Sequence, residues 1–147
     1  MVEANQGGPW GPDFASRKRW FDAFPLHRQL GLTLEEQRAG YARCLLSTSP
    51  FTLGGVGGSV HGGILAAIVD CAMLAALGGL LGEDEQPSGT ADLNITYMRP
   101  ALGERVYAEA NVIKKGRSLA VTEVTISDSQ GRLCAKGRTL YAIRARD

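Results

Sequence analysis

One stretch of this chain is apolar on nearly every face of a predicted helix, yet it carries a carboxylate near its centre. Residues 60–77 read Val-His-Gly-Gly-Ile-Leu-Ala-Ala-Ile-Val-Asp-Cys-Ala-Met-Leu-Ala-Ala-Leu. A helix of this kind in a globular protein is wrapped by other elements, because it has no broad polar face for water. An ionised Asp70 in such surroundings costs on the order of several kcal/mol of desolvation unless it is paired. Asp70 is therefore the first candidate for chemistry.

The same stretch, counted from Ile64 to Leu81, approaches the roughly 20 apolar residues that cross a bilayer. Asp70 near its centre and Gly78-Gly79 near its end argue against a membrane helix, and no basic residue follows immediately. We therefore expect a buried helix in a protein without a membrane partner.

Composition bounds the remaining possibilities. The 147 residues carry 16 Lys+Arg against 15 Asp+Glu, so one domain with its own core is expected, with no overall field to recruit nucleic acid. Cys44, Cys71 and Cys134 are odd in number and lack metal-ligand spacing, which favours reduced thiols, a cytoplasmic location and no metal site. Residues 1–14 lack the apolar stretch of a signal peptide. We expect a disordered or extended tail there and a single domain at 15–147.

After Gly89 the apolar residues recur at every second position, which is typical of strands. The pattern predicts four strands, at 90–98, 105–114, 118–127 and 132–143, joined after the first by hairpin turns. In the first of them, Leu93, Ile95 and Tyr97 share one face. Upstream, 33–37 and 41–48 predict a hairpin, and 16–24 predicts a short helix halted by Pro25, with Trp20 and Phe24 inward. This order predicts an α+β fold in which an antiparallel sheet is wrapped around a long central helix.

Several motifs, in this order and spacing, resemble the hotdog-fold acyl-CoA thioesterases. The motifs are His61-Gly62-Gly63, the acidic residue nine positions after the histidine, the strand Asp92-Leu93-Asn94-Ile95-Thr96-Tyr97-Met98-Arg99-Pro100, and Lys115-Gly116-Arg117-Ser118 followed by Asp128 and Gly131. The chain is most similar to the phenylacetic-acid-degradation type, which is similar to 4-hydroxybenzoyl-CoA thioesterase-like proteins. The resemblance runs from about residue 30 to residue 143 and implies the hotdog fold.

The resemblance implies hydrolysis of an aromatic or medium-chain acyl-CoA to free acid and coenzyme A, with no cofactor because coenzyme A is part of the substrate. By the same resemblance, the N–H of Gly62 stabilises the oxyanion, Asp70 is the nucleophile or general base, and His61 orients or polarises the thioester. Thr90 would place a hydroxyl near the acid. Unpaired N–H groups and the dipole at a helix N-terminus do favour negative charge, and glycine admits a ligand closely. In the alternative interpretation these glycines relieve crowding, Asp70 is a satisfied core group, and Thr90 is an ordinary strand residue.

The resemblance also implies substrate-binding positions around one strand end and one hairpin. They are Gly63, Arg99, Lys114, Lys115, Gly116, Arg117 and Ser118. The four basic residues among them form a predicted cluster for the phosphates of coenzyme A, although a solvated rim would look the same. One departure concerns the loop before His61, where related enzymes often carry Asn. In this chain the loop at 52–59 offers only Thr52 and Ser59 as polar residues.

Geometry predicts an assembly. Gly62 and Asp70 are eight residues apart, which on one helix is roughly 12 Å, whereas a reacting carbonyl must lie about 3 to 3.5 Å from the attacking atom. We therefore expect a two-fold homodimer in which Gly62 of one subunit faces Asp70 of the other. The resemblance implies the same arrangement, with one continuous sheet and often a dimer of dimers, hence a homotetramer.

Two other functions remain open from the sequence. One is a non-catalytic hotdog module that binds acyl-CoA or an acyl carrier, and the other is a hotdog dehydratase. Asp70 argues against the first, because a binder of an apolar chain has no use for a carboxylate at the helix centre. The positions of the histidine and the acid argue against the second, because they follow the thioesterase arrangement.

Overall fold

The computed structural model describes residues 10–147, so most of the predicted 1–14 tail lies outside the described residues. The elements follow the predicted order, with one extra helix near the start. They are α1 (Phe14–Ala23), α2 (Pro25–Leu30), β1 (Leu32–Arg38), β2 (Tyr41–Ser47), the 3-10 turn η1 (Val56–Gly58), α3 (Gly62–Leu77), β3 (Glu85–Tyr97), β4 (Arg105–Lys115), β5 (Leu119–Asp128) and β6 (Leu133–Ala145).

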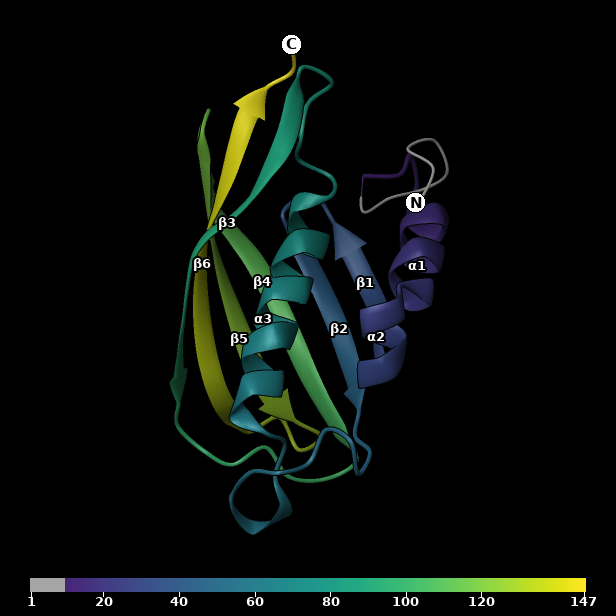
Figure 1. The fold of residues 1–147 in the computed structure, drawn as a ribbon, viewed down its shortest axis with the longest axis vertical. Coiled ribbons are helices and arrows are strands. Elements are labelled where there is room, and N and C mark those ends of the chain that lie inside the picture. Colours follow the sequence, from purple (N-terminus) through teal and green to yellow (C-terminus); the bar gives the residue numbers. More distant parts are fainter. Residues whose placement is uncertain (1–9) are drawn as a thin grey trace.

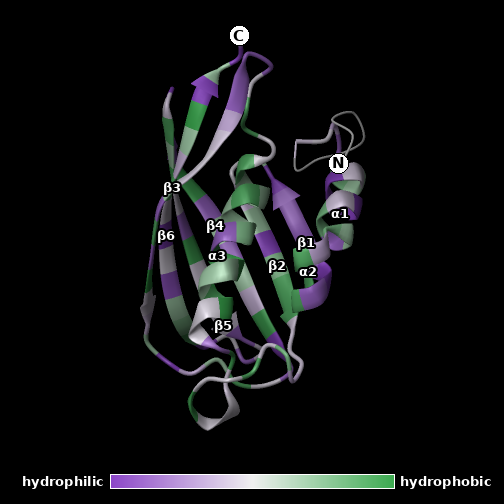
Figure 2. Ribbon diagram, viewed as in Figure 1, coloured by the Kyte–Doolittle hydropathy of each residue, from purple (hydrophilic) through white to green (hydrophobic). Residues whose placement is uncertain are grey.

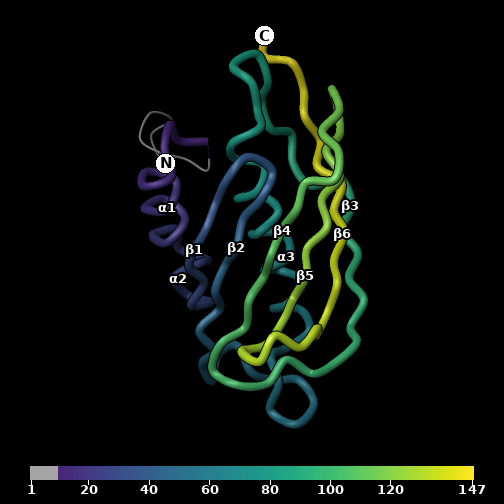
Figure 3. Tube along the Cα trace, turned by 180° about the vertical axis from the view of Figure 1, so that it is seen from behind, coloured from purple at the N-terminus to yellow at the C-terminus, as the bar shows by residue number. Residues whose placement is uncertain are grey.

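The six strands form one sheet in the order β1-β2-β4-β5-β6-β3, and every neighbouring pair is antiparallel. The helix α3 lies against one face of this sheet, while α1 and α2 lie beside β1 (Figure 1). Seen from behind, the strands lie in front of α3 (Figure 3). The predicted α+β arrangement of an antiparallel sheet around a long central helix is confirmed. Because β3 ends the strand order, one of its edges has no partner strand within residues 10–147.

The sheet-facing side of α3 forms the centre of the core. Its buried side chains, Leu65, Ile68, Val69, Ala72, Met73 and Ala76 among them, pack with inward residues of the strands, and the apolar colouring of α3 is visible in Figure 2. The helix approaches β6 so closely that a Cβ added at Gly137 would lie 2.6 Å from a methyl of Val69. Within residues 10–147, no helix is long and apolar enough to cross a membrane.

Strand β3 contains an irregularity that the alternating pattern did not predict. Its pairing with β6 shifts between Thr90 and Asp92, so Ala91 is an extra residue in the ladder. Such a bulge reverses the alternation of faces beyond it. Thr90 therefore faces α3 together with Leu93, Ile95 and Tyr97. Strict alternation would have placed Thr90 on the opposite face.

The N-terminal region differs from its prediction in two respects. Pro25 does not only end the first helix but also begins α2 at its first position, where proline is favoured because no N–H is needed there. Phe21 is the fully buried aromatic residue, whereas Trp20 and Phe24 are half-buried and pack on each other with ring centres 5.0 Å apart.

Candidate active site

The first turn of α3 leaves one N–H group without an acceptor within the described residues. The side chain of His61 caps the helix, because its Nδ1 accepts from the Gly63 N–H at 2.9 Å. The carbonyl of His61 accepts from the N–H groups of Ile64 and Leu65, at 2.9 and 3.1 Å. The Gly62 N–H is the group that remains. It belongs to the same planar peptide unit as the His61 carbonyl, and it points the opposite way, out of the helix end.

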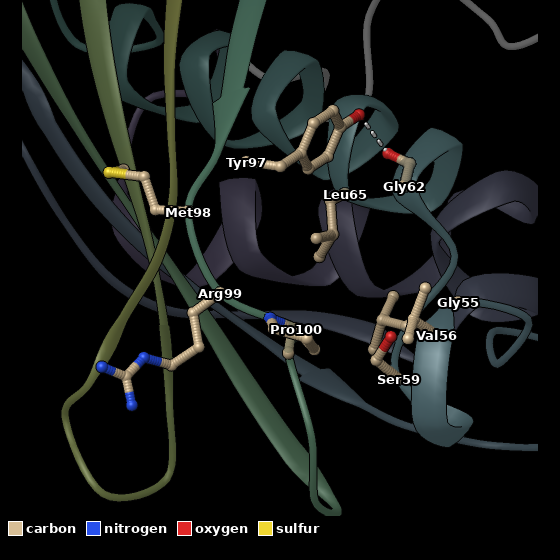
Figure 4. Close-up of a pocket in the computed structure, with 11 residues that line it drawn as sticks. Gly55, Val56, Ser59, Gly62, Leu65, Tyr97, Met98, Arg99 and Pro100 are labelled. Atoms are coloured by element: carbon tan, nitrogen blue, oxygen red, sulfur yellow. Dashed lines mark hydrogen bonds between the residues drawn. The ribbon is translucent and has the colours of Figure 1, made fainter.

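A cavity of about 370 Å³ opens beside this N–H group. Its lining comes from the loop before α3, the first turn of α3, and the segment after β3, and it includes Val56, Ser59, Leu65, Tyr97, Arg99 and Pro100 (Figure 4). The Tyr97 hydroxyl donates to the carbonyl of Gly62 at 2.7 Å. A Cβ at Gly62 would lie 3.4 Å from the Tyr97 ring, so the start of the helix packs directly beside this tyrosine. The lining is mainly apolar, which suits an acyl chain or a pantetheine arm.

The loop before α3 uses its two polar side chains differently. Thr52 is fully buried and its hydroxyl donates to the Ser49 carbonyl at 3.1 Å, so it is committed to the loop itself. Ser59 is also buried, but it lines the cavity. Ser59 is thus the one of these two polar loop residues that faces the space where a ligand could bind.

Asp70 lies farther along the same helix, next to Thr90, the residue whose hydroxyl the resemblance places near the acid. The Thr90 hydroxyl donates to Oδ1 of Asp70 at 2.7 Å. Asp70 is half-buried, on the side of α3 that the sheet leaves uncovered. Tyr141 pairs with Thr90 across β3 and β6 and is buried at the same level. Burial, with a contribution from the Asp70 carboxylate, raises the pKa of Tyr141, and the same causes raise the pKa of Cys71 to about 12.

Two chemical consequences follow from these contacts. Because the Thr90 hydroxyl donates to Oδ1 of Asp70, Oδ2 of Asp70 is the oxygen that remains available to a water or a carbonyl carbon. Cys71 remains a thiol at neutral pH because its pKa is so high, so it has no role as a nucleophile.

The predicted basic cluster does not exist within one subunit. Arg99 follows β3 at the end where Tyr97 pairs with Ala135. Lys115 lies at the opposite end of the sheet, where Ala120 pairs with both Lys115 and Tyr141. Since six residues of β6 separate these levels, the two ends are about 20 Å apart.

The hairpin residues also differ among themselves. Lys115 pairs with Glu85 at 2.7 Å and holds the pKa of that carboxyl below its usual value. The N–H of Gly116 closes the turn on the Leu119 carbonyl at 2.8 Å. Lys114, Arg117 and Ser118 are exposed at the tip. Lys114 and Arg117 are therefore the cations of this hairpin that remain available to a phosphate.

Sequence reasoning missed two tyrosines of this region. The alternating pattern placed Tyr97 on the correct face of its strand but indicated no role for it. Tyr141 was predicted only to lie in the last strand. Their contacts with Gly62 and with the Asp70 level depend on how the sheet curls, which no local pattern encodes.

Comparisons with known proteins agree with this architecture. The model of the thioesterase superfamily matches residues 57–135. The protein named acyl-coenzyme A thioesterase 13 of Homo sapiens is 43% identical over 83 residues, which cover 55% of this chain and 58% of that protein. The chain thus spans less than two thirds of that relative. Medium/long-chain acyl-CoA thioesterase YigI of Escherichia coli (strain K12) is 29% identical over 132 residues, covering 81% of this chain and 85% of the relative.

A solved structure gives the same result at the level of the fold. The crystal structure of zebra fish thioesterase superfamily member 2 matches with a TM-score of 0.76 at 27% identity, covering 90% of this chain and 99% of that chain. The family model matches more than half of the residues, from η1 to the start of β6. This chain therefore belongs to the thioesterase superfamily and has its hotdog fold.

Proposed function

We propose that this protein is an acyl-CoA thioesterase that hydrolyses medium-chain or aromatic acyl-CoA to the free acid and coenzyme A. Two groups on one helix carry the proposal. The first is the Gly62 N–H, which has no acceptor within residues 10–147 and lies beside an apolar cavity, and the second is the oriented carboxylate of Asp70. The names of the human and Escherichia coli relatives support acyl-CoA as the substrate class. An aromatic acyl group and the phenylacetic-acid-degradation type rest on the motif resemblance.

The proposed reaction divides the work between the two groups. The thioester oxygen accepts from the Gly62 N–H, which stabilises the negative charge that develops there. As a general base, Oδ2 of Asp70 takes a proton from a water that attacks the carbonyl carbon; the C–O bond to that water forms, the C–S bond breaks, and the departing thiolate of coenzyme A takes up the proton. As a nucleophile, Oδ2 attacks the carbon itself, so the C–S bond breaks, the thiolate leaves and an acyl anhydride forms on Asp70. A water then hydrolyses this anhydride, which frees the acid and the carboxylate and supplies the proton to the thiolate. Thr90 holds the carboxylate in place through Oδ1.

One subunit cannot complete this site, because Gly62 and Asp70 are separated by roughly 12 Å along α3. We propose that a two-fold homodimer brings Gly62 of one subunit to the partner's Asp70. The uncovered side of α3 supports this, since it consists mainly of small or apolar residues that let a second helix approach. They are Gly63, Ala66, Ala67, Asp70 and Leu74. The axis would pass near Ala66, midway between Gly62 and Asp70.

The outer edge of β3, which has no partner strand within residues 10–147, supports one register for the proposed dimer. Thr90 lies at the level of Asp70, and Tyr97 lies at the level of Gly62. Their order on the helix-facing side of β3 is Thr90, Leu93, Ile95, Tyr97. A two-fold axis perpendicular to the sheet pairs them in reverse order, so Tyr97 faces the partner's Thr90 and Asn94 faces the partner's Asn94. The two sheets then join into one.

The same proposed axis brings basic residues of the two subunits to one end of the joint sheet. It places Arg99 of one subunit at the end of the joint sheet that carries the partner's Lys114 and Arg117. We propose that this composite basic surface binds the phosphates of coenzyme A. The further association into a dimer of dimers stays a prediction. A cytoplasmic location also stays a prediction, and it is supported by three buried thiols with no disulfide within residues 10–147, which suit a reducing compartment.

Hydrolysis of a panel of acyl-CoA substrates, followed by detection of the released thiol, tests the activity. We expect turnover of medium-chain or aromatic substrates, and a loss on the order of 10²-fold or more in Asp70→Asn, which keeps the shape but removes the base. Tight binding of acyl-CoA without turnover by the wild-type protein would instead favour the non-catalytic module.

The register is tested by cross-linking. Asn94→Cys should form a disulfide-linked dimer on mild oxidation, because residues opposite each other on antiparallel strands lie within the Cα range of a disulfide. Thr96→Cys is the matched control, because it shares a face with Asn94 but lies away from the axis. Efficient linking of Thr96→Cys instead of Asn94→Cys would contradict the register.

A further inference from the structure

The first turn of α3 has few contacts of its own to hold it in place. Its first two residues are Gly62 and Gly63, and neither offers a side chain that packs. Glycine also loses more backbone freedom on folding than any other residue. The direction of the Gly62 N–H, the candidate oxyanion donor, therefore depends on contacts made from outside this turn.

Two side chains supply such contacts, and both hold the peptide unit that joins Gly62 to Gly63. The Tyr97 hydroxyl donates to the Gly62 carbonyl at 2.7 Å (Figure 4), and Nδ1 of His61 accepts from the Gly63 N–H at 2.9 Å. The C=O and N–H of one peptide unit point in opposite directions, so this unit is held at both ends. It shares the Cα atom of Gly62 with the unit that carries the Gly62 N–H, so fixing one unit restricts the other.

Tyr97 makes this contact from an anchored position. It is the last residue of β3, and the next N–H along the chain, that of Met98, donates to the Cys134 carbonyl at 2.9 Å. Its ring lies beside the helix start, since a Cβ at Gly62 would be 3.4 Å from its Cζ atom. A carbonyl oxygen has two lone pairs, so the bond from Tyr97 leaves room for a helical bond to the same oxygen.

We propose that Tyr97 is a positioning residue, whose hydroxyl holds the peptide unit after Gly62 so that the Gly62 N–H stays aimed at the cavity. This inference rests on the proposed thioesterase function and adds a residue to its oxyanion site. The phenol has a single hydrogen. While Gly62 accepts it, it is not available to a thioester or to the partner's Asp70, which the proposed dimer brings to this helix end. The hydroxyl therefore acts on the reaction through Gly62.

The first test is Tyr97→Phe, which keeps the ring and its packing but removes the hydroxyl. We expect kcat to fall about fivefold, as for the loss of one neutral hydrogen bond, and KM to stay within about twofold because the cavity keeps its lining. Tyr41→Phe is the matched control. It also removes a bonded hydroxyl, which donates to Glu109 at 3.1 Å between β2 and β4, away from the cavity. Its kcat should stay within about twofold of the wild-type value.

A rescue experiment separates the hydrogen bond from the shape of the side chain. Replacement of Tyr97 by 4-aminophenylalanine restores an N–H donor at the same point of the ring. We expect its kcat to return to within about twofold of the wild-type value. A kcat as low as that of Tyr97→Phe would contradict the role of the donor.

A readout without substrate separates this inference from the thioesterase proposal. The N–H groups of Gly63, Ile64 and Leu65 are all bonded to His61, through its side chain or its carbonyl. In hydrogen exchange followed by NMR on the ligand-free protein, these three amides should exchange about threefold or more faster in Tyr97→Phe, but not in Tyr41→Phe.

Two results would overturn the proposal. A lower kcat in Tyr97→Phe with unchanged exchange at these amides would mean that the hydroxyl acts on the substrate or on the partner's Asp70. Faster exchange with an unchanged kcat would mean that the contact stabilises the helix but does not serve the reaction. Faster exchange in a protein whose wild-type form hydrolyses no acyl-CoA would uphold the contact and refute the proposed function.

Discussion

The sharpest test of the proposed oxyanion donor is Gly62→Pro, because proline removes the N–H and little else. Gly62 is the first residue of α3, the position at which proline is most readily accepted, since its N–H has no helical partner. Proline also restricts the residue before it to extended conformations. His61 already has φ −57° and ψ 134°, which satisfies that restriction. The added Cβ would be 3.4 Å from the Tyr97 ring, an ordinary contact.

The expected magnitude follows from these contacts. Removing one oxyanion donor lowers kcat by about 10² to 10³-fold, or roughly 2.7 to 4 kcal/mol of transition-state stabilisation. The free energy of unfolding should change by less than about 1 kcal/mol, because no hydrogen bond of α3 is broken. Gly62→Ala is the matched control, since it adds the same Cβ but keeps the N–H, and should lose less than about tenfold.

Release of the coenzyme A thiol measures kcat, and thermal melts on the same samples measure the change in the free energy of unfolding. A folded Gly62→Pro protein with kcat close to that of Gly62→Ala would refute the assignment of the Gly62 N–H. Equal, severe losses in both variants would show that space beside Tyr97, and not the N–H, is what the reaction needs.

Three further perturbations probe other parts of the account. Arg117→Glu should raise KM for acyl-CoA about tenfold but hardly affect a short thioester without the nucleotide; equal effects on both would mean a structural role. Thr122 and Thr139 are paired across β5 and β6, and both hydroxyls are fully buried without a partner in the described chain, so changing both to Val should raise the free energy of unfolding by about 1 kcal/mol or more in a thermal melt. A loss of stability would indicate that they hold a buried water. Burial lowers the pKa of His27, so the unfolded chain binds its proton more readily and stability should fall as the pH drops below about 6.5; His27→Leu should flatten that dependence in denaturant titrations, and an unchanged slope would contradict it.

The strands and the central helix were predictable because each leaves a periodic record in the sequence. Period-two alternation located β4, β5 and β6 within a few residues, and the unbroken apolar stretch located α3. The start of β3 was placed at Thr90, five residues late, because Glu85, Pro87 and Gly89 do not alternate like a strand. Pairing with β6 keeps them in the sheet nonetheless.

The site was predictable only in part, for reasons of geometry. The pairing of Thr90 with Asp70 came from the family resemblance, and the bulge at Ala91 that makes it possible leaves no mark in the composition. Arg99 and Arg117 were grouped because both lie near strand ends. The direction of each strand decides which strand ends lie at the same end of the sheet. Within one subunit, Arg99 and Arg117 lie at opposite ends.

The central claim is that each site combines Gly62 of one subunit with Asp70 of another, and subunit exchange tests it most directly. Gly62→Pro and Asp70→Asn proteins, each inactive alone, are mixed in equal amounts and allowed to exchange, and mixed dimers are verified by mass. Half of the dimers are then mixed, and each has one intact site of two, so the mixture should recover about a quarter of the wild-type activity. If mixed dimers form and remain inactive, the shared site is wrong.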